Sequence, residues 1–388
     1  MREISSLSIS RYIYMTSKKQ AGADNYSLWN APRYTAGAFA KLSPYAQLEY
    51  FCLLAHLAPS SHNTQPWRFK IDVKKYGIEV LVDRTAILPE SDPTGRQALI
   101  SMGCCIGNIT EGARCYSLVP RVSYTAVKSV DVLPLANAKA KNRYTRLATI
   151  TFVPGKVATP GAVLKALFSR KVVRAEFDTV KKVSHTLLQK AVRAGAGEGI
   201  RTLFLDKAPD RLKVSELQQQ ADGFVANSPK FAKELGAWIL PNDTTSYVGM
   251  PGSNMGLTQE GSARLHLGLL GKIKLKPEDM LKFSLGTKFL IERSAVLGFL
   301  FGKTDTPINW LKTGMLATKQ FLLFEMNNVS VSIHAGLTEV GLVHDIFTNT
   351  FSQAGKLLMV YRIGYVKRKE DLLRPHSPRL PMEQIIIH

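Results

Sequence analysis

The spacing of apolar and polar side chains predicts a helix, a hairpin and a second helix in the first third of the chain. Residues 43–58 carry apolar side chains at helical intervals, and this helix is expected to end there because a proline follows. Residues 67–73 alternate apolar with polar side chains, as a strand does, and residues 77–86 predict its hairpin partner. Residues 92–118 predict a long helix whose small side chains let another helix approach closely.

A similar order of elements returns later in the chain. The pattern predicts a basic stretch running into a helix at 162–195, a strand at 200–206, helices at 210–227 and 228–240, a strand at 294–302, a helix at 306–327 and a strand at 356–366. The coarse order of helix, strands and helix therefore occurs twice. This repetition predicts an α+β fold made of two tandem halves.

The length of the chain agrees with two halves. Its 388 residues exceed the roughly 250–300 residues at which a single core stops growing. We expect residues 1–42 to form an irregular leader, residues 43–160 the first half and residues 161–388 the second half. Residues 241–262 have the Gly, Pro and Asn content of a long mobile loop.

The charge balance is strongly basic. The chain has 51 Lys and Arg against 30 Asp and Glu, a formal net charge of +21. Such an excess attracts nucleic acid, anionic lipid or phosphorylated ligands, although a basic surface without a function is an equal alternative. The basic residues are spread over many segments, and no run is dense enough to form a nucleic-acid-binding arm. We therefore expect no specific nucleic-acid partner.

Cysteine usage and hydropathy favour a cytoplasmic protein. No CxxC spacing occurs, which fits a reducing compartment and predicts neither a disulfide framework nor a metal site. The first residues lack the continuous apolar stretch of a secretory signal. The most apolar later segment, residues 288–303, is too short and too charged to cross a bilayer, so no membrane partner is expected.

The loop at residues 57–71, "LAPSSHNTQPWRFKI", holds the densest group of polar side chains. A hydrolase site would need a nucleophile elbow or an oriented base, and the chain contains no GxSxG. A metal site would need more ligands than His56 and His62. Two alternatives stay open: the hydroxyls, amide and backbone cradle a planar heterocycle, or they only cap and turn the chain.

This loop resembles the "PSxxNxQPW" loop of the nitroreductase superfamily, whose members hold FMN at the seam between two α+β subunits. Further segments are similar in order and spacing to the Acg-type branch, in which one chain contains two nitroreductase-like halves. These segments are "VDRTAILPESDPTGRQALISMGCCIGNI", "INWLKTGM", "LLMVYRIGY" and "SPRLPMEQII". The resemblance covers roughly residues 43–388 and implies a nitroreductase-like fold whose halves form an internal pseudo-dimer. A monomer is therefore expected.

The resemblance implies one FMN site built from both halves. Its first wall, against the isoalloxazine ring, would be Pro59, Ser60, Ser61 and Asn63. The segment "SRKVVRAEF" resembles the arginine motif of the family, and "SPRLP" resembles its C-terminal arginine. These matches imply that Arg170, Arg174 and Arg379 approach the ribityl phosphate.

Two positions depart from the family pattern. Val172 stands where the arginine motif has Ser or Thr, which removes one hydroxyl from the phosphate site. Asn328 stands where the family has a Gly whose backbone amide contacts flavin N5. Asn tolerates the left-handed conformation, so we expect the turn at Asn328 to be kept and to bind the cofactor.

The function implied by the resemblance is that of an FMN-dependent oxidoreductase. NAD(P)H would reduce the flavin and leave, and a small acceptor of nitroaromatic or quinone type would then take the electrons, without a catalytic side chain. The alternative is a protein that stores or sequesters FMN without turnover, with residues 241–262 as a lid. A binder of nucleic acid or anionic surfaces rests on the charge alone.

Overall fold

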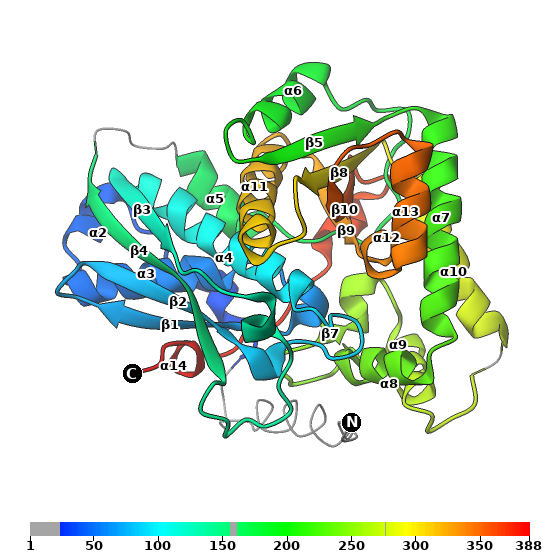
Figure 1. Ribbon diagram of the computed structural model, residues 1–388, viewed down its shortest axis with the longest axis horizontal. Coiled ribbons are helices and arrows are strands. Elements are labelled where there is room, and N and C mark those ends of the chain that lie inside the picture. The colour runs from blue at the N-terminus through cyan, green and yellow to red at the C-terminus, as the bar shows by residue number, and fades with distance from the viewer. Residues whose placement is uncertain (1–23, 156–160, 276) are drawn as a thin grey trace.

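The described residues, 24–155, 161–275 and 277–388 of a computed structural model, form two α+β halves (Figure 1). The first half contains η1 (Ser27–Asn30), α2 (Ala36–Ala40), α3 (Pro44–His56), η2 (Ser61–Asn63), β1 (Trp67–Asp72), β2 (Gly77–Asp83), η3 (Arg84–Ala86), α4 (Arg96–Arg114), β3 (Leu118–Tyr124), η4 (Ser129–Val132) and β4 (Tyr144–Pro154).

The second half begins with α5 (Gly161–Ser169), α6 (His185–Arg193), β5 (Ile200–Leu205), α7 (Ala208–Ala226), α8 (Pro229–Trp238), β6 (Ile239–Leu240), β7 (Met250–Pro251), η5 (Gly252–Met255) and α9 (Gln259–Leu269). It continues with α10 (Pro277–Glu292), β8 (Val296–Gly302), α11 (Pro307–Met326), β9 (Ser330–His334), α12 (Gly336–Glu339), α13 (Gly341–Thr350), β10 (Lys356–Gly364), η6 (Lys369–Leu373) and α14 (Met382–Ile385).

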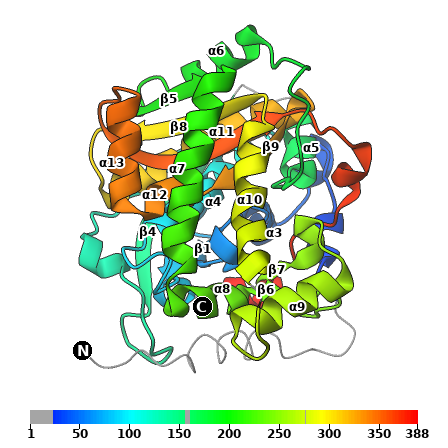
Figure 2. The same ribbon diagram turned by 90° about the vertical axis from the view of Figure 1, so that its right-hand side faces the viewer.

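Each half builds one four-stranded sheet. The strand order is β1-β2-β4-β3 in the first sheet and β5-β8-β10-β9 in the second. All neighbouring strands within these two sheets are antiparallel. In the second half, α7 and α10 lie side by side along the outer edge, with α8 and α9 at one end of the pair (Figure 2). The predicted α+β fold with two tandem halves is confirmed.

Local sequence signals explain the elements that were predicted well. The Ser43 side chain accepts a hydrogen bond from the backbone of Ala46, and Pro44 occupies the first turn, so α3 begins where expected. The buried side chains of Trp67 and Phe69 alternate along β1, which pairs with β2 as a hairpin. The carboxylate of Asp92 accepts hydrogen bonds from the backbone amides of Gln97 and Ala98 in the first turn of α4.

The expected irregular leader is wrong for part of its length. Residues 1–23 lie outside the described residues, but η1 and α2 occupy much of 24–42. Trp29 is buried, and its indole donates a hydrogen bond to the carbonyl of Ser377 at 2.8 Å. Phe39 stacks on Tyr116 with a ring separation of 3.9 Å. Trp29 and Phe39 contact residues that are far away in the sequence. The polar composition of this segment therefore led to the wrong prediction of an irregular leader.

The two halves meet where α4 crosses α11. Gly103 on α4 lies so close to α11 that an added Cβ would overlap the carbonyl oxygen of Leu311. Gly314 on α11 is in the same position with respect to the carbonyl oxygen of Ile100. The predicted close approach of a second helix is therefore made possible by glycines on both helices.

The C-terminal arm returns from the second half to the first. After β10, Ile386 pairs in parallel with Phe69 of β1, and the amide of Ile387 donates to the Phe69 carbonyl at 2.8 Å. His56 of α3 holds the arm in place through both ring nitrogens. Its Nδ1 accepts a hydrogen bond from the Trp67 indole at 2.7 Å, and its Nε2 donates to the Leu380 carbonyl at 2.8 Å. The arm is thus anchored on α3 and on the edge of the first sheet.

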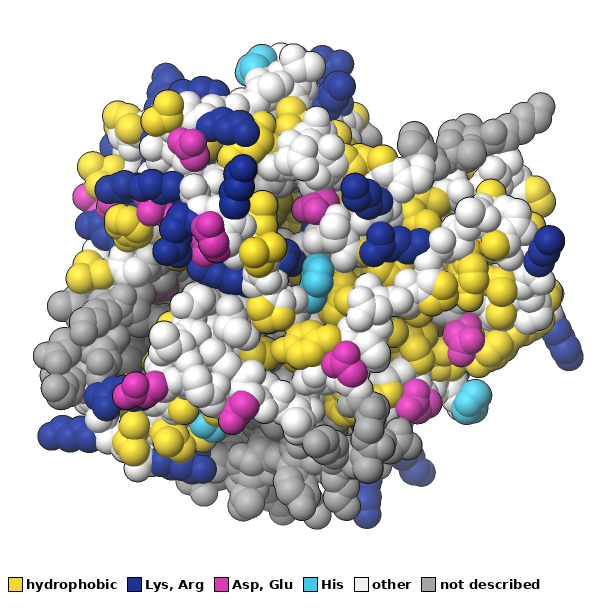
Figure 3. Space-filling model, turned by 180° about the vertical axis from the view of Figure 1, so that it is seen from behind, with side chains coloured by type: hydrophobic (Ala, Val, Ile, Leu, Met, Phe, Trp, Pro, Cys, Tyr) yellow, Lys and Arg dark blue, Asp and Glu magenta, His cyan; other side chains and the backbone are white. Residues whose placement is uncertain are grey.

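Surface charge is scattered on the face shown in Figure 3. Lys and Arg side chains there are separated by apolar and uncharged atoms and by acidic side chains. Among the helices of the described ranges, none combines the length and the apolar character needed to cross a membrane.

The α4/α11 contact predicts a marked difference between two glycine substitutions. Gly103→Ala should destabilise the chain by about 1–3 kcal/mol or more, because the new methyl group must push the helices apart. Gly223→Ala on α7 meets no atom within 4 Å and should stabilise the chain by about 0.5–1 kcal/mol. Chemical denaturation measures both, and a Gly103→Ala protein as stable as wild type would contradict the close packing.

His56 predicts a specific pH dependence of stability. Burial, then the nearby Arg379 charge, lowers its pKa from 6.5 to about 3. Between about pH 6.5 and pH 3, His56 binds a proton in the unfolded chain but not in the folded chain. The free energy of unfolding therefore falls as the pH drops through this range. In His56→Gln, the slope of unfolding free energy against pH between about pH 6 and 4 should be shallower by up to about 1.4 kcal/mol per pH unit.

The matched control for His56 is His185, which is exposed on α6. His185→Gln should keep the wild-type slope in the same denaturation series. An unchanged slope in His56→Gln would show that His56 is not the neutral anchor of the arm.

Candidate functional site

The serine loop, residues 59–65, has an unusual backbone. His62, Asn63 and Gln65 have φ values of 49°, 57° and 52°, in the left-handed region that residues with a side chain rarely adopt. Each such residue costs on the order of 1–3 kcal/mol and persists only where its surroundings fix it. Ser60 supplies part of that support, because its hydroxyl accepts a hydrogen bond from the amide of Gln65 at 3.0 Å.

Asn63 joins the serine loop to two distant segments. Its Nδ2 donates to the carbonyls of Gly249 and Pro378, both at 3.0 Å, and its Oδ1 accepts from Arg379 at 2.8 Å. The Asn63 amide is therefore fully engaged within the chain.

Gln65 makes a second set of links to the same segments. Its Nε2 donates to the Tyr247 carbonyl at 2.8 Å, and its Oε1 accepts from the Leu380 amide at 2.9 Å. The loop, the segment 246–250 and the C-terminal arm consequently hold one another in place.

Three arginines line a small hollow of about 60 Å³ beside this loop. Arg170 and Arg379 are each 4% exposed, and Arg174 is partly buried. Arg379 donates to the carbonyls of His56 and Ala58, at 2.7 and 3.0 Å.

The other two arginines have fewer partners. Arg170 donates to the Leu57 carbonyl at 2.8 Å, whereas Arg174 makes a longer contact, from its guanidinium to the Met250 sulfur at 3.7 Å. None of Arg170, Arg174 and Arg379 pairs with a carboxylate in the described ranges.

Burial and the nearby positive charges lower the pKa values of several groups around the small hollow. Burial, then the charge of Arg170, lowers the pKa of Arg379 to about 9. Burial, followed by Lys171 and Arg379, lowers the pKa of His376 to about 3. Burial and Arg174 lower the pKa of His62 to about 4. These histidines are therefore neutral near pH 7, and the small hollow is a cationic pole that lacks its own anion.

A second hollow of about 490 Å³ adjoins the first. Pro59, Ser60, Val172, Arg174 and Met250 line both of them. Much of the larger wall is apolar, with Ile100, Leu235, Ile239, Leu265, Leu290 and Leu358 among its members. A volume of 300–1,000 Å³ with a few placed polar groups is usual for a small-molecule or cofactor site.

A buried arginine orients a histidine at the wall of the larger hollow. Arg362 on β10 is fully buried, lies 4.3 Å from the ring centre of Phe177, and donates through Nε to Nε2 of His334 at 3.0 Å. Burial and the charges of Arg362 and Arg174 lower the pKa of His334 well below its usual value. Because Nε2 accepts, the neutral His334 ring carries its proton on Nδ1 and is available as a donor.

The structure brings most of the predicted site residues together. Pro59, Ser60, Asn63, Arg170, Arg174 and Arg379 all line the small hollow, and Ser61 lines the larger one. They come from both halves of the chain, as the resemblance implied.

Asn328 does not join the other predicted residues. Its φ of 56° confirms the left-handed turn, but the residue is exposed and lines neither hollow. The structure therefore does not bring Asn328 together with the other predicted site residues, and its contact with a cofactor stays a prediction. The chain first continues as β9, and the residues beyond that strand, His334, Ala335 and Gly336, reach the larger hollow instead.

Several lining residues were missed in the sequence. Trp29 and His376 stack at 4.0 Å and close one side of the small hollow, and His62 and His334 line the larger one. His62 was set aside because it lacked metal or catalytic partners in sequence. Its position within the serine loop was the signal that could have identified His62 as a site residue. The others lie in segments whose local pattern carries no sign of a site.

Comparisons with known proteins agree with this arrangement. No family model matches the chain. An uncharacterized protein of Mycobacterium tuberculosis, Rv3127, is 24% identical over 341 residues, which cover 86% of this chain and 91% of the relative. The Mycobacterium tuberculosis protein named "Putative NAD(P)H nitroreductase acg" is 23% identical over 345 residues, covering 86% of this chain and 92% of the relative.

Among solved structures, the FMN-dependent nitroreductase NfnB from Mycobacterium smegmatis, in complex with NADPH, is 17% identical with a TM-score of 0.39. The match covers 58% of this chain and 97% of that one. The curated relatives, by contrast, align with this chain through both of its halves. Over most of its length the chain is therefore similar to mycobacterial proteins, some of which are named putative NAD(P)H nitroreductases.

Proposed function

We propose that the protein is an FMN-binding oxidoreductase that uses NAD(P)H to reduce a small acceptor of nitroaromatic or quinone type. One observation carries the proposal. A hollow lined by three arginines without acidic partners opens onto a larger and mostly apolar hollow, at the seam between the two halves. The names of the curated relatives point to the same chemistry.

The cationic pole fits a phosphate group. Burying a charge without a counter-ion is costly, and a phosphate dianion would compensate Arg170, Arg174 and Arg379 together. A charge-assisted hydrogen bond contributes roughly 1.5–3 kcal/mol. Val172 adds no hydroxyl to this pole, so the arginines would supply most of the binding energy.

The larger hollow fits a planar ring system. Pro59, Ser60 and Ser61 would form one wall against it, and His334 would offer a hydrogen-bond donor from the second half. Asn63 would act indirectly, because its amide holds Arg379 and the segment at Gly249. FMN, when bound, supplies the electron-transfer chemistry, while the chain binds, orients and shields the ring.

A second candidate function is the storage of FMN without turnover. It is favoured by the contacts of the proposed lid, residues 241–262. Gly249 and Tyr247 are hydrogen-bonded to the serine loop, and Met250 lines both hollows. Asn25 adds a hydrogen bond to the Ser246 carbonyl at 2.8 Å. A lid that stays in this position would keep a nicotinamide away from the ring.

We further propose that the protein acts as a cytoplasmic monomer. The second half supplies across the α4/α11 contact what a partner subunit would supply to a single nitroreductase-like unit. Light scattering of the purified chain should therefore give the mass of one copy.

Arg174 gives the cleanest test of the phosphate pole. Arg174→Ala should weaken FMN binding about tenfold to a hundredfold, because one charge-assisted contact to phosphate is lost. The same change should not lower the melting temperature of the FMN-free protein, since Arg174 makes only a weak contact to Met250. Fluorescence titration with FMN and thermal unfolding measure the two effects.

Arg170→Ala should also weaken FMN binding, and Arg379→Ala should in addition destabilise the chain because its carbonyl contacts are lost. Arg121 is exposed on β3, so Arg121→Ala is the matched control and should bind FMN as the wild type does. Unchanged affinity in both Arg170→Ala and Arg174→Ala would exclude this hollow as the phosphate site.

Anaerobic mixing with NADPH or NADH separates the two candidate functions. An oxidoreductase should lose its yellow flavin absorbance on mixing, and the colour should return on addition of a quinone. A storage protein should keep its colour throughout. A chain that stays colourless and gains no flavin absorbance with added FMN would contradict both.

A further inference from the structure

The larger hollow has a polar part of its wall besides Arg174. Gln218 and Asp222, one turn apart on α7, line it together with Glu339 at the end of α12. The Nε2 of Gln218 donates to Asp222 Oδ1 at 2.7 Å. Gln218 is only 2% exposed, yet its Oε1 has no hydrogen-bond donor among the described residues, and neither has Oδ2 of Asp222. The Asp222 carboxyl group also interacts with the Thr287 side chain, which lines the same hollow.

Glu339 belongs to the same polar part of the wall and is tied to the serine loop. Gln97 on α4 donates to Glu339 Oε1 at 2.7 Å, and its own oxygen accepts from the Ser61 hydroxyl at 2.7 Å. All these side chains line the larger hollow. This part of the wall therefore offers several acceptor oxygens, two of which have no donor among the described residues.

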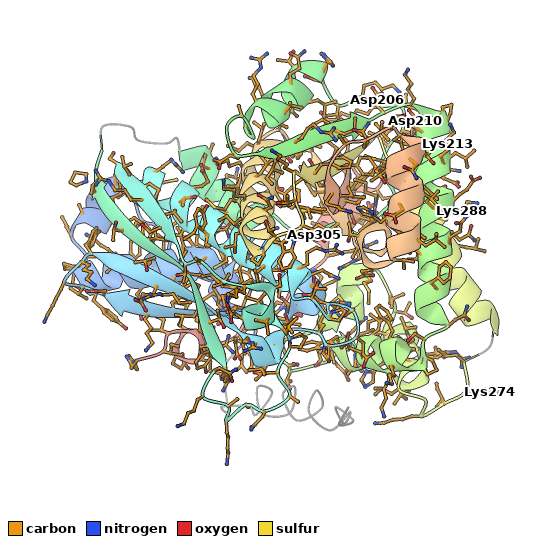
Figure 4. The ribbon with its side chains drawn as sticks, in the orientation of Figure 1. Asp206, Asp210, Lys213, Lys274, Lys288 and Asp305 are labelled. Atoms are coloured by element: carbon orange, nitrogen blue, oxygen red, sulfur yellow. The ribbon has the colours of Figure 1, made fainter. Side chains whose placement is uncertain are left out.

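The charges around this part of the wall leave it acidic towards the hollow. Arg96 lies nearest to Glu339, but its guanidinium is engaged with the Thr338 carbonyl and with Asp305, 3.9 Å away. Figure 4 shows Lys213 and Lys288 on the outer sides of α7 and α10. A further cation of the wall, Arg174, lines both hollows, and His62, which lines the larger one, is neutral near pH 7.

We propose that this acidic end, formed by Gln218, Asp222 and Glu339, is a subsite for a cationic, hydrogen-bond-donating group of the acceptor substrate. An ammonium, an amidinium or a protonated heterocycle has this chemistry. The inference rests on the proposed function, because it names the class of acceptor that the hollow selects. A cation would supply donors to the buried oxygens, whereas an anion would face two carboxyl groups.

The pKa values of the two carboxyl groups give the proposed subsite a second measurable signature. Burial raises the pKa of Asp222 to about 6, and burial raises the pKa of Glu339 to about 7. A bound cation favours the charged form of a carboxyl group, so it should lower both pKa values and release protons. Proton release on binding is thus a second signature of this subsite.

A matched set of small probes tests the subsite. Benzylamine, benzyl alcohol and benzoate share one ring and differ in charge, and their binding to the full chain loaded with FMN can be measured by calorimetry at pH 7. We expect benzylamine to bind about tenfold more tightly than benzyl alcohol, with proton release, and benzoate to bind most weakly. Equal binding of benzylamine and benzyl alcohol would overturn the proposal.

Substitutions of the two carboxyl groups test whether they cause the preference for benzylamine. Asp222→Asn and Glu339→Gln should each reduce the preference for benzylamine over benzyl alcohol to about threefold or less. Glu216 is exposed on α7, and Glu216→Gln should keep the wild-type preference. Thermal unfolding of each variant shows whether it is folded. A preference that survives in both folded carboxyl variants would also overturn the proposal.

Turnover separates this inference from the proposed function. If NADPH bleaches the flavin, 4-nitrobenzylamine should have a kcat/KM about tenfold above that of 4-nitrobenzyl alcohol. Bleaching with equal kcat/KM values and equal probe binding would reject the subsite alone. Failure to retain FMN or to bleach would reject the proposed function, while calorimetry on the same chain still decides whether the cation subsite exists.

Discussion

Uncompensated positive charge at the seam between the halves is the constraint on which this structure depends. Arg170, Arg379 and Arg362 are almost completely buried, and Arg174 lines both hollows with one weak contact. Backbone carbonyls and aromatic rings carry part of the cost, as Arg379 lies 4.8 Å from the ring centre of Trp29. Burying such charges without a counter-ion is costly, and in the proposed function a phosphate group would compensate them.

The site exists only when distant parts of the chain have assembled. The serine loop lies in the first half, the arginine segment in the second, and the C-terminal arm crosses back over α3. Asn63 and Gln65 accept or donate hydrogen bonds to both the lid and the arm, so these segments hold the left-handed loop in shape. Close packing of α4 on α11 sets the distance between the two walls.

The distribution of charged and apolar side chains in the two hollows would orient a bound ligand. Arginines line the smaller hollow, and the larger hollow combines an apolar wall with Arg174 and the carboxyl groups of Asp222 and Glu339. In the proposed function this arrangement places the phosphate, the ring and the acceptor in separate environments. Met250, Met255 and Leu257 of the segment 241–262 line the larger hollow.

The sequence by itself determined the elements with strong periodicity and the two main walls of the site. The helices at α3, α4 and α11 and the hairpin of β1 and β2 follow from local spacing and capping. The residues of the serine loop and the three arginines were also recognisable, because motif residues lie close together along the chain. Strands β3 and β4, which lie next to each other in the first sheet, were missed because β3 is nowhere fully buried and its pattern is weak.

Only the tertiary structure decided which side chains meet. Residue type predicted the left-handed turn at Asn328, but not that the turn would be exposed. The roles of His334 and Arg362 depend on burial and on a contact between neighbouring strands. The acidic end depends on the packing of α12 against α7 and on its hydrogen bond to α4. Such properties arise from desolvation and from contacts between distant residues, and local sequence patterns carry neither.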